Sequence, residues 1–346
     1  MLYTTYLQAV YNASLIECMN KTTSGQKEML QRHADFSSKF NVYSDYPALH
    51  LYNFCLNTLI VSEFNKDKAS KKRTFEVGVN SLGDLTYGQY LINHFNIALR
   101  DSDKMEFRLA NFTLERYDLS DQTTVPDSID YRDYLRAPLN QDRCQSSYLH
   151  AGTDAIAFAY AKNNNLKNIS ISKQYFIDCG HQHMYPSCSG GNPEHVFDFS
   201  SKFGIVKEEA YPYKGVARRC NVTNMEDILP FDFIKGAFHY NMKKTDEIKK
   251  LISKYGPLVT SMSASDVSIM LYSNGIINQD CEDKIINHYV LIVGYGKDEE
   301  SGVHYWIVRN SFGEDWGEGG YFRIEMGRNL CNIEKKIIGL IAKDLK

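Results

Sequence analysis

The spacing of apolar residues changes along this chain, and the change predicts a helical part followed by a strand-rich part. Over residues 34–65, apolar side chains recur at intervals of three and four, the repeat of an amphipathic helix, and Pro47 interrupts the series. Residues 146–161 are rich in alanine and show the same interval, which predicts a buried helix. Residues 285–296 and 303–309 are dominated by β-branched and aromatic residues, which favour strands joined by a polar loop. A helical half followed by a β half implies two lobes with a cleft between them.

Changes of composition suggest where the chain divides into domains. Residues 100–122 are polar and charged with no strong period, which predicts an exposed linker. The composition changes again at the stretch VPDSIDYRDY, so we expect a boundary near residues 120–126. The predicted organisation is an N-terminal region over 1–33, a second segment over 34–122 and the main domain over 123–346.

Size, charge and residue types argue against several classes of partner. Hydrophobic residues make up 43% of the 346 residues, so the chain can bury a large core. A net charge of −3 gives no reason to expect nucleic acid or an anionic membrane as a partner. No segment approaches the roughly 20 apolar residues of a membrane-spanning helix. His181 and His183 form a His-x-His pattern without further ligands at metal-binding spacing, so we expect neither a metal nor another cofactor.

Cysteines and glycosylation sequons favour a secreted or endo-lysosomal protein. Six of the eight cysteines follow Val125, which suggests disulfides and an oxidising compartment, although the residues alone leave about 15 ways to pair six cysteines. Residues 1–20 carry Thr, Gln and Asn where a signal peptide has an unbroken apolar stretch, so a signal there would be atypical. Five Asn-X-Ser/Thr sequons occur, of which we expect the last two to carry glycans: Asn12, Asn20, Asn111, Asn168 and Asn221.

Four stretches follow one another in the order and at the spacing of a known family. They are NQDRCQSSYLHA at 140–151, SKQYFIDC at 172–179 with CSGGNP at 188–193, NHYVLIVGYG at 287–296 and YWIVRNSFGEDWGEGGYFRI at 305–324. Over roughly residues 125–340 the chain therefore resembles the papain family of cathepsin-like cysteine proteases. The resemblance implies an α+β, papain-like fold with a helical L lobe and a β-barrel-like R lobe, preceded by a helical inhibitory propeptide.

The segment before the main domain is similar, more weakly, to the propeptide of that family. The family's helical pattern of Phe, Asn, Ile and Asn is represented here by Phe54, Asn57, Val61 and Asn65, with His50 and Tyr46 replacing its basic and acidic members. A second pattern, Gly-x-Asn-x-Phe-x-Asp, is represented by Gly78, Asn80, Leu82 and Asp84. The resemblance implies that this segment helps the mature part to fold and lies across its cleft.

The resemblance also implies a pairing of the six cysteines that follow Val125. The expected disulfides are Cys144–Cys188, Cys179–Cys220 and Cys281–Cys331. Each such bridge typically stabilises a protein by about 2–4 kcal/mol, so retention of all three suggests that the fold is still needed.

The nucleophile is the one catalytic group that departs from the family. Cysteine proteolysis needs a thiolate, a base, a group that orients the base, and donors for the oxyanion. The resemblance makes Gln141 a side-chain oxyanion donor, His288 the general base and Asn310 the orienting residue. Ser147 stands in place of the cysteine, with its backbone N–H as the second oxyanion donor. A helix N-terminus and an imidazolium can lower a thiol pKa from about 8.5 to roughly 3.5, but a hydroxyl is too weak an acid to ionise with that help. We therefore expect hydrolysis to be slower by many orders of magnitude.

The residues around the nucleophile differ from the family as well. Gln145 replaces a glycine beside the expected path of the substrate backbone, and Tyr289 replaces a small residue of the main specificity pocket. Tyr148 and His150 replace Trp and Phe on the helix that follows Ser147. The resemblance makes Phe312 and Trp316 an aromatic pair that shields the His288–Asn310 hydrogen bond. The remaining expected substrate-binding positions are Gly190, Gly191 and Pro193.

These substitutions favour a secreted pseudoprotease that binds peptides, protease inhibitors or host proteins in the inherited cleft, which its own propeptide would cover. The stretch HYWIVRNSFGEDWGEGGY is similar to the mite group-1 allergen proteases. One alternative is a hydrolase that uses Ser147 and His288, or a condensing enzyme similar to silicateins, which also carry serine followed by tyrosine. Another is an engineered Cys-to-Ser mutant of an active endopeptidase, but an engineer would change one residue and several differ. Gln141 and His288 also have a structural interpretation, as a loop-packing residue and a hydrogen-bonded core histidine.

Overall fold

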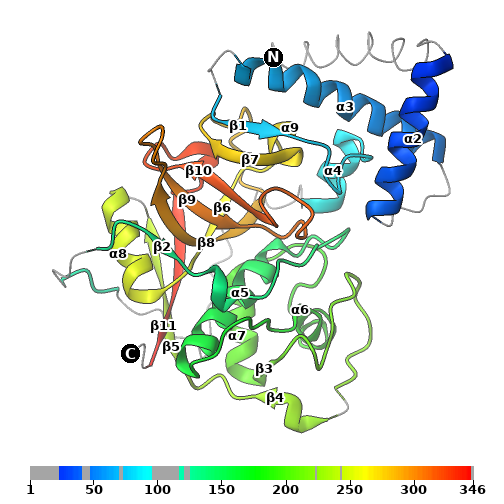
Figure 1. Ribbon diagram of the computed structural model, residues 1–346. Helices are drawn as coiled ribbons and strands as arrows, with labels where there is room; N and C mark the ends of the chain where they lie inside the picture. The colour runs from blue at the N-terminus through cyan, green and yellow to red at the C-terminus, as the bar shows by residue number, and fades with distance from the viewer. Residues whose placement is uncertain are drawn as a thin grey trace.

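A group of helices and a large mixed sheet form two lobes that meet along one long central helix, α5 (Figure 1). The structure is a computed structural model, and it describes residues 23–40, 47–69, 73–95, 117–120, 125–222, 224–241 and 244–343. This architecture is the α+β, two-lobed fold expected from the sequence, with the pro-segment (residues 23–95 of the described chain) packed on it.

The helical lobe is built around α5 (Ser147–Asn163), whose many small side chains let all but its last turn lie buried in the protein. Gly152 shows how close the packing is, because a Cβ there would lie 3.1 Å from a methyl carbon of Val196. The remaining elements of this lobe are α6 (Lys173–Tyr175), a π turn (Phe176–Gly180), α7 (Pro193–Phe203), η4 (Met225–Asp227) and the strand pair β3 (Ile205–Val206) and β4 (Ile228–Leu229).

The second lobe is a single large sheet, and α5 packs against one of its faces. Its strand order is β1-β7-β10-β9-β8-β6-β11-β5, and β2 (Ile129–Asp130) also pairs with β8. Strand β8 (His288–Lys297) is buried at every position but the last, which explains why its sequence shows no alternation of apolar and polar residues. The other strands are β7 (Tyr272–Ile277), β10 (Tyr321–Glu325), β9 (His304–Arg309), β6 (Leu258–Met262), β11 (Lys336–Ala342) and β5 (Ile234–Asn241). Four short helices complete the mature part: η2 (Arg132–Tyr134), α8 (Thr245–Tyr255), α9 (Val267–Met270) and η5 (Leu330–Asn332).

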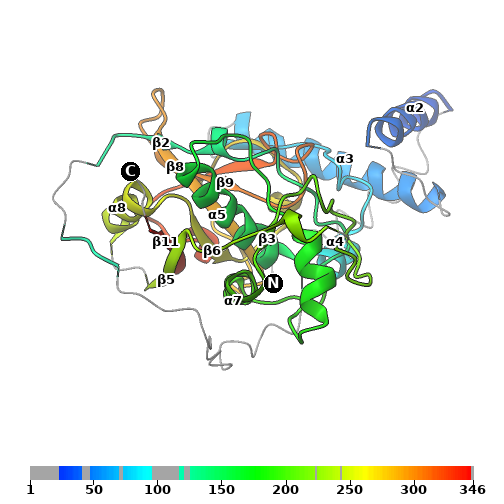
Figure 2. The same cartoon turned by 90° about the horizontal axis from the view of Figure 1, so that it is seen from below.

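The pro-segment lies at one end of the molecule and reaches back to the sheet (Figures 1 and 2). Its helices α2 (Thr23–Phe40) and α3 (Pro47–Ala69) cross with Phe36 and Phe54 in ring contact at 4.9 Å. Strand β1 (Phe75–Val77) then pairs with β7, and α4 (Tyr87–His94) follows, capped at Thr86 by a reciprocal capping box.

Residues of the expected propeptide patterns hold these pieces together. Asn57 donates from its amide to the carbonyl oxygens of Gly83 and Leu85, and Asn65 exchanges two hydrogen bonds with the backbone of Val77. His50, which replaces the family's basic residue, forms an ion pair with Asp84. The helix α3 therefore fixes the loop that leads into α4.

Several sequence predictions need comment here. The expected break between residues 33 and 34 falls inside α2, where the His33 ring packs on Phe54 at 5.4 Å, so the helix is continuous across that boundary. Pro47 does not merely interrupt a helix but begins α3, because its fixed φ suits the first helical turn. Tyr46, most of the expected linker over 100–122 and the sequons at Asn12, Asn20 and Asn111 lie outside the described residues.

A buried ion cluster joins the two lobes behind the cleft. Asp154 of α5 accepts hydrogen bonds from Lys173 at 2.7 Å and from Arg309 of β9 at 2.5 Å. Burial alone would raise the pKa of Asp154, but the two cations outweigh it and lower the pKa to about 2. This cluster locks the helix that carries Ser147 to the strand that precedes Asn310.

Three disulfides pair the cysteines as the resemblance implies: Cys144–Cys188, Cys179–Cys220 and Cys281–Cys331. Within the part of the chain that the structure describes, no helix has the length and apolar character needed to cross a bilayer. The same residues contain no group of three or more His, Cys, Asp or Glu side chains suited to a metal ion.

Candidate active site

His288 and Asn310 form the best-defined polar pair in the cleft. His288 begins β8 and Asn310 follows β9, so the β8–β9 pairing brings the two residues together. Asn310 Oδ1 accepts the backbone N–H of Ser311 at 2.8 Å, which fixes the orientation of the amide. The facing His288 Nε2, at 2.8 Å from the same oxygen, must therefore be the donor. In the neutral ring this leaves Nδ1 as an acceptor, and it has no hydrogen-bond partner among the described residues.

The environment of His288 favours the neutral imidazole. Burial lowers the pKa of His288 to about 4, although the hydrogen bond that the ring donates to Asn310 opposes this shift. Phe312 lies over the ring with 5.1 Å between centroids, and Trp316 packs edge-on against Phe312 while donating to carbonyl oxygens of α9. The aromatic pair thus packs beside the His288–Asn310 hydrogen bond, and its role in excluding water stays a prediction.

Ser147 is the first residue of α5, and its hydroxyl is engaged away from the base. Ser147 Oγ accepts the backbone N–H of Tyr289 at 3.2 Å. Within the described chain neither ring nitrogen of His288 forms a hydrogen bond with Ser147, because Nε2 binds Asn310 and Nδ1 is unpartnered. Tyr289 follows His288 directly, so Ser147 lies next to the base, but no hydrogen bond joins the two side chains among the described residues.

Gln141 is fully buried and held by hydrogen bonds on both sides of its amide. Its Oε1 accepts from Ser311 Oγ at 2.6 Å, which leaves Nε2 as a donor. Nε2 donates to the carbonyl oxygen of Cys144 and to that of His94, each at 3.1 Å. His94 belongs to the pro-segment, so the expected oxyanion donor already binds a carbonyl oxygen of the chain itself.

The pro-segment covers this constellation directly. Phe95 stands edge-on over the His288 ring at 5.5 Å, and Tyr90 contacts Phe312 while donating to the carbonyl oxygen of Ala264 at 2.7 Å. Gln145 was expected to obstruct the substrate path, and here its side-chain amide donates to the pro-segment carbonyl of Ile92 at 2.9 Å. The described part of the cleft is therefore occupied by residues 90–95.

Tyr289 spans the cleft from one lobe to the other. Tyr289 is the second residue of β8. Its hydroxyl donates to Asn192 Oδ1 at 2.7 Å, and Asn192 is the N-cap of α7 in the helical lobe. Pro193 begins the same helix, and Gly190 in the loop before it has a positive φ of 83°. The tyrosine thus occupies space beside the glycine loop where the resemblance places the main specificity pocket.

Tyr148 and Gly191 depend on each other sterically. A Cβ on Gly191 would lie 2.8 Å from the Tyr148 ring, so only glycine fits at this position. The Tyr148 hydroxyl is buried and donates to the carbonyl oxygens of Pro186 and Ser187, both at 2.9 Å. This hydroxyl is therefore satisfied inside the protein and does not face the cleft.

Sequence reasoning missed the partners that orient these side chains. Ser311 and Asn192 lie inside the recognised motifs, so their positions offered a signal, but neither motif indicates what they contact. His94 and Phe95 had no local signal, because only the folded pro-segment brings them to the site.

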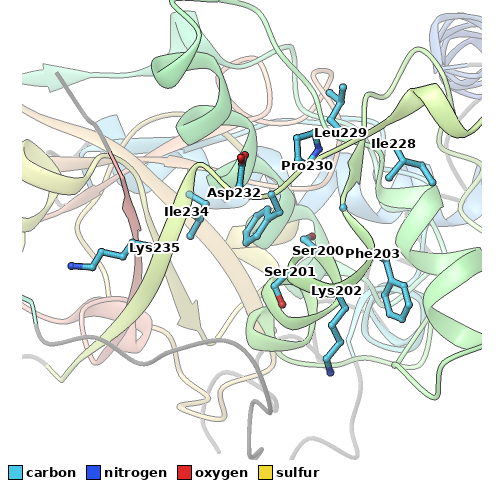
Figure 3. Close-up of a pocket in the computed structure, with 12 residues that line it drawn as sticks. Ser200, Ser201, Lys202, Phe203, Ile228, Leu229, Pro230, Asp232, Ile234 and Lys235 are labelled. Carbon is cyan, nitrogen blue, oxygen red and sulfur yellow. The ribbon is translucent and has the colours of Figure 1, made fainter.

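One surface hollow of the described chain lies away from the cleft. It has a volume of about 560 Å³ and is bounded by the end of α7 and by β4 and β5, with Phe203, Pro230 and Ile234 among its walls (Figure 3). None of the expected site residues lines it. We therefore assign the functional site to the cleft and not to this hollow.

Comparisons with known proteins agree with the geometry. Residues 125–341 match the family described as papain family cysteine protease. The chain is 32% identical over 292 residues to a cathepsin L-like protein of Caenorhabditis elegans, covering 82% of each. The structure superposes on digestive procathepsin L 3 of the Tenebrio molitor larval midgut with a TM-score of 0.78 at 23% identity, over 93% of this chain and 100% of that one. It also matches the proform of Amb a 11, a ragweed pollen cysteine protease, with a TM-score of 0.74 at 26% identity, over 93% and 96% of the two chains.

Proposed function

This chain belongs to the papain family of cysteine proteases, and on that premise we propose that it is a proteolytically inactive member that binds peptide or protein ligands in its cleft. The observation that carries the proposal is the state of Ser147. A serine stands at the nucleophile position, its hydroxyl is engaged with the Tyr289 backbone, and the base His288 has an unpartnered Nδ1.

The chemistry of a hydroxyl supports this proposal. A cysteine at the start of α5 would lose its proton to the imidazole before substrate binds, because the helix terminus stabilises the thiolate. Ser147 would have to be deprotonated during the reaction, by a base whose pKa burial lowers to about 4. Serine proteases achieve this with the hydroxyl hydrogen-bonded to the histidine, and that contact is not formed here.

Changes in the cleft support loss of proteolysis independently of the nucleophile. Tyr289 bridges to Asn192 and fills space that a substrate side chain would need. Gln145 brings an amide to the position of a glycine, and that amide contacts a main chain lying in the cleft. Both residues would instead suit a ligand that is held by hydrogen bonds to its backbone and is not cleaved.

The retained scaffold is the reason to propose a binding protein. The three disulfides each cross-link one lobe and the buried Asp154 cluster joins the two lobes, although no chemistry requires them. Disulfides of this kind favour the secreted or endo-lysosomal location predicted from the sequence. Asn168 and Asn221 are exposed, as a glycan would require, and the glycans remain predictions. We propose peptides, protease inhibitors or host proteins as ligands, and the mite group-1 subfamily also stays a prediction.

The alternatives receive less support from the geometry. A condensing enzyme similar to silicateins would need the hydroxyl of Tyr148 near the reacting group, but that hydroxyl binds two carbonyl oxygens inside the helical lobe. A Ser–His hydrolase would need the contact between Ser147 and His288 that is missing here. For the engineered origin, the test is the natural gene, since a cysteine codon at position 147 would replace our proposal with an ordinary protease.

Two experiments test the proposal. The full chain, intact and after cutting of its pro-segment by an added protease, is incubated with fluorogenic peptides and with a fluorophosphonate probe. We expect no turnover above that of the matched Ser147→Ala variant, and labelling of Ser147 would sink the proposal.

The second experiment separates the nucleophile from the pocket. Ser147→Cys is prepared alone and together with Tyr289→Ala, and an E-64-type probe reports whether the thiol is reactive. Peptidase activity in the single variant would show that Ser147 alone silences the site. Activity only in the double variant would show that Tyr289 also blocks the substrate.

A further inference from the structure

The start of α5 retains the features that stabilise a negative charge, but this chain supplies no negative charge there. In a cysteine protease the helix N-terminus and the imidazolium face a thiolate. The helix α5 is 17 residues long, so its first N–H groups carry the full positive end of the helix dipole. Ser147 Oγ is neutral, so the position of the anion is empty of charge while the groups around it remain.

One buried nitrogen of the site, Nδ1 of His288, points to a ligand. His288 is 1% exposed, and its Nδ1 has no partner among the described residues although the other nitrogen is fully engaged. An unpartnered nitrogen buried to this extent costs free energy, which an anionic ligand would recover through a protonated ring. The Tyr289 N–H that binds Ser147 Oγ shows that this end of β8 lies against the first turn of α5.

An oxygen atom already sits where such a ligand would bind. Gln141 Nε2 donates to the carbonyl oxygen of His94, and Gln145 Nε2 donates to that of Ile92. These two contacts hold the last turn of α4 in the cleft by its carbonyl oxygens. The two glutamine amides thus favour the carbonyl oxygens of a peptide backbone. The uncompensated positive end of α5 favours a negative charge at the end of that peptide.

We propose that Gln141, the start of α5 and His288 form a receptor for the free C-terminal carboxylate of a peptide, the product of another protease's cleavage. This inference rests on the proposed function, since an active hydrolase would cut its ligand. One carboxylate oxygen would replace the His94 carbonyl on Gln141 Nε2, and the other would face His288 Nδ1. A peptide amide has the same shape but lacks the charge that this site stabilises.

Binding of the carboxylate should bring a proton with it. While the pro-segment covers the site, His288 is neutral at pH 6, since burial lowers its pKa to about 4, and an adjacent carboxylate raises the pKa of the ring. The only other titratable group that acts on His288 in the described chain is His94, which also lowers its pKa and leaves with the pro-segment. Asn310, Phe312 and Phe95, which also contact the ring, do not titrate.

The test compares two peptide pools that differ at one group. Labelled hexapeptides of mixed sequence are made with a free C-terminal carboxylate and with a C-terminal amide. Both pools are titrated at pH 6 in low salt against the full chain carrying Tyr90→Ala, which loosens the pro-segment, and against the full chain cut by an added protease. Fluorescence anisotropy measures binding, and calorimetry in two buffers of different ionisation enthalpy measures proton uptake.

We expect the acid pool to bind at least tenfold more tightly than the amide pool, with uptake of a proton. Ser147→Asp places a carboxylate in the site within the chain itself, so the preference should fall below twofold, whereas the matched Ser147→Ala variant should keep it. Equal binding of the two pools, binding of neither, or a preference that survives Ser147→Asp overturns the inference. Cleavage of either pool by the unsubstituted chain refutes the proposed function instead, which keeps the two failures distinct.

Discussion

Replacing Tyr90 by alanine tests whether α4 holds the pro-segment on the cleft. Tyr90 is 0% exposed, its ring contacts Phe312, and its hydroxyl binds the carbonyl oxygen of Ala264. Removing a buried aromatic ring costs about 3–5 kcal/mol, and the carbonyl left without its donor adds about 1 kcal/mol. Since each ~1.4 kcal/mol is a factor of ten, the undocked state of α4 should become roughly a thousandfold more populated.

Hydrogen exchange measures this directly at the backbone amide of Phe95, which donates to the carbonyl oxygen of Leu91. The matched control is Tyr87→Ala, because Tyr87 lies on the same helix and donates to the carbonyl of Ser265 but is 46% exposed. Its loss should cost only about 0.5–1.5 kcal/mol, or about tenfold in exchange. If the two variants accelerate exchange equally, burial of the Tyr90 ring does not hold α4 in place and the reasoning is wrong.

Three further predictions concern the groups around the cleft. Asp154→Asn leaves Arg309 and a lysine buried without their anion, so we expect a loss of about 3–5 kcal/mol in chemical denaturation, and no loss would contradict the cluster's role. In the unsubstituted protein that contribution should disappear as the pH falls from about 3.8 towards about 2, because the folded-state pKa is the lower one. His94 and His288 have folded-state pKa values of about 4, so the unfolded state binds more protons between pH 6.5 and 4, and proteolysis of the pro-segment should quicken over that range. Gln145→Ala removes one hydrogen bond to the pro-segment, worth about 0.5–1.5 kcal/mol, and should speed that proteolysis by up to about tenfold.

Helices and strands that are set by the residues of one short stretch could be predicted from the sequence. The alanine-rich stretch that follows Ser146 and the β-branched stretch that follows Asn287 are α5 and β8, because burial of each element leaves a sequence dominated by apolar residues. The residues of the candidate site were found through resemblance, since motifs distant in sequence had to be taken together. The start of α2 at Thr23 was missed, because its first turns carry few apolar residues.

Contacts between distant segments could not be predicted. Gln141 and His94 are 47 residues apart, and Tyr289 and Asn192 are 97 apart. Each pair meets because two lobes and a separate segment pack together, and no spacing along the chain records that packing. Tyr289 was expected to fill a pocket on steric grounds, but its hydrogen bond to the opposite lobe follows only from the folded geometry.

The pairing of β1 with β7 has a consequence for maturation that is unrelated to the cleft. While Phe75 faces Gly275 in the register, β7 is an inner strand with partners on both sides. Removing the pro-segment would make β7 an edge strand with unpaired backbone groups, the kind of edge through which proteins aggregate. Gly275 has a φ of 95°, and a Cβ there would lie 2.4 Å from the carbonyl oxygen of Thr74. The mature strand therefore carries a residue that fits closely against a neighbour that processing would take away, and the pro-segment covers an edge of the mature sheet.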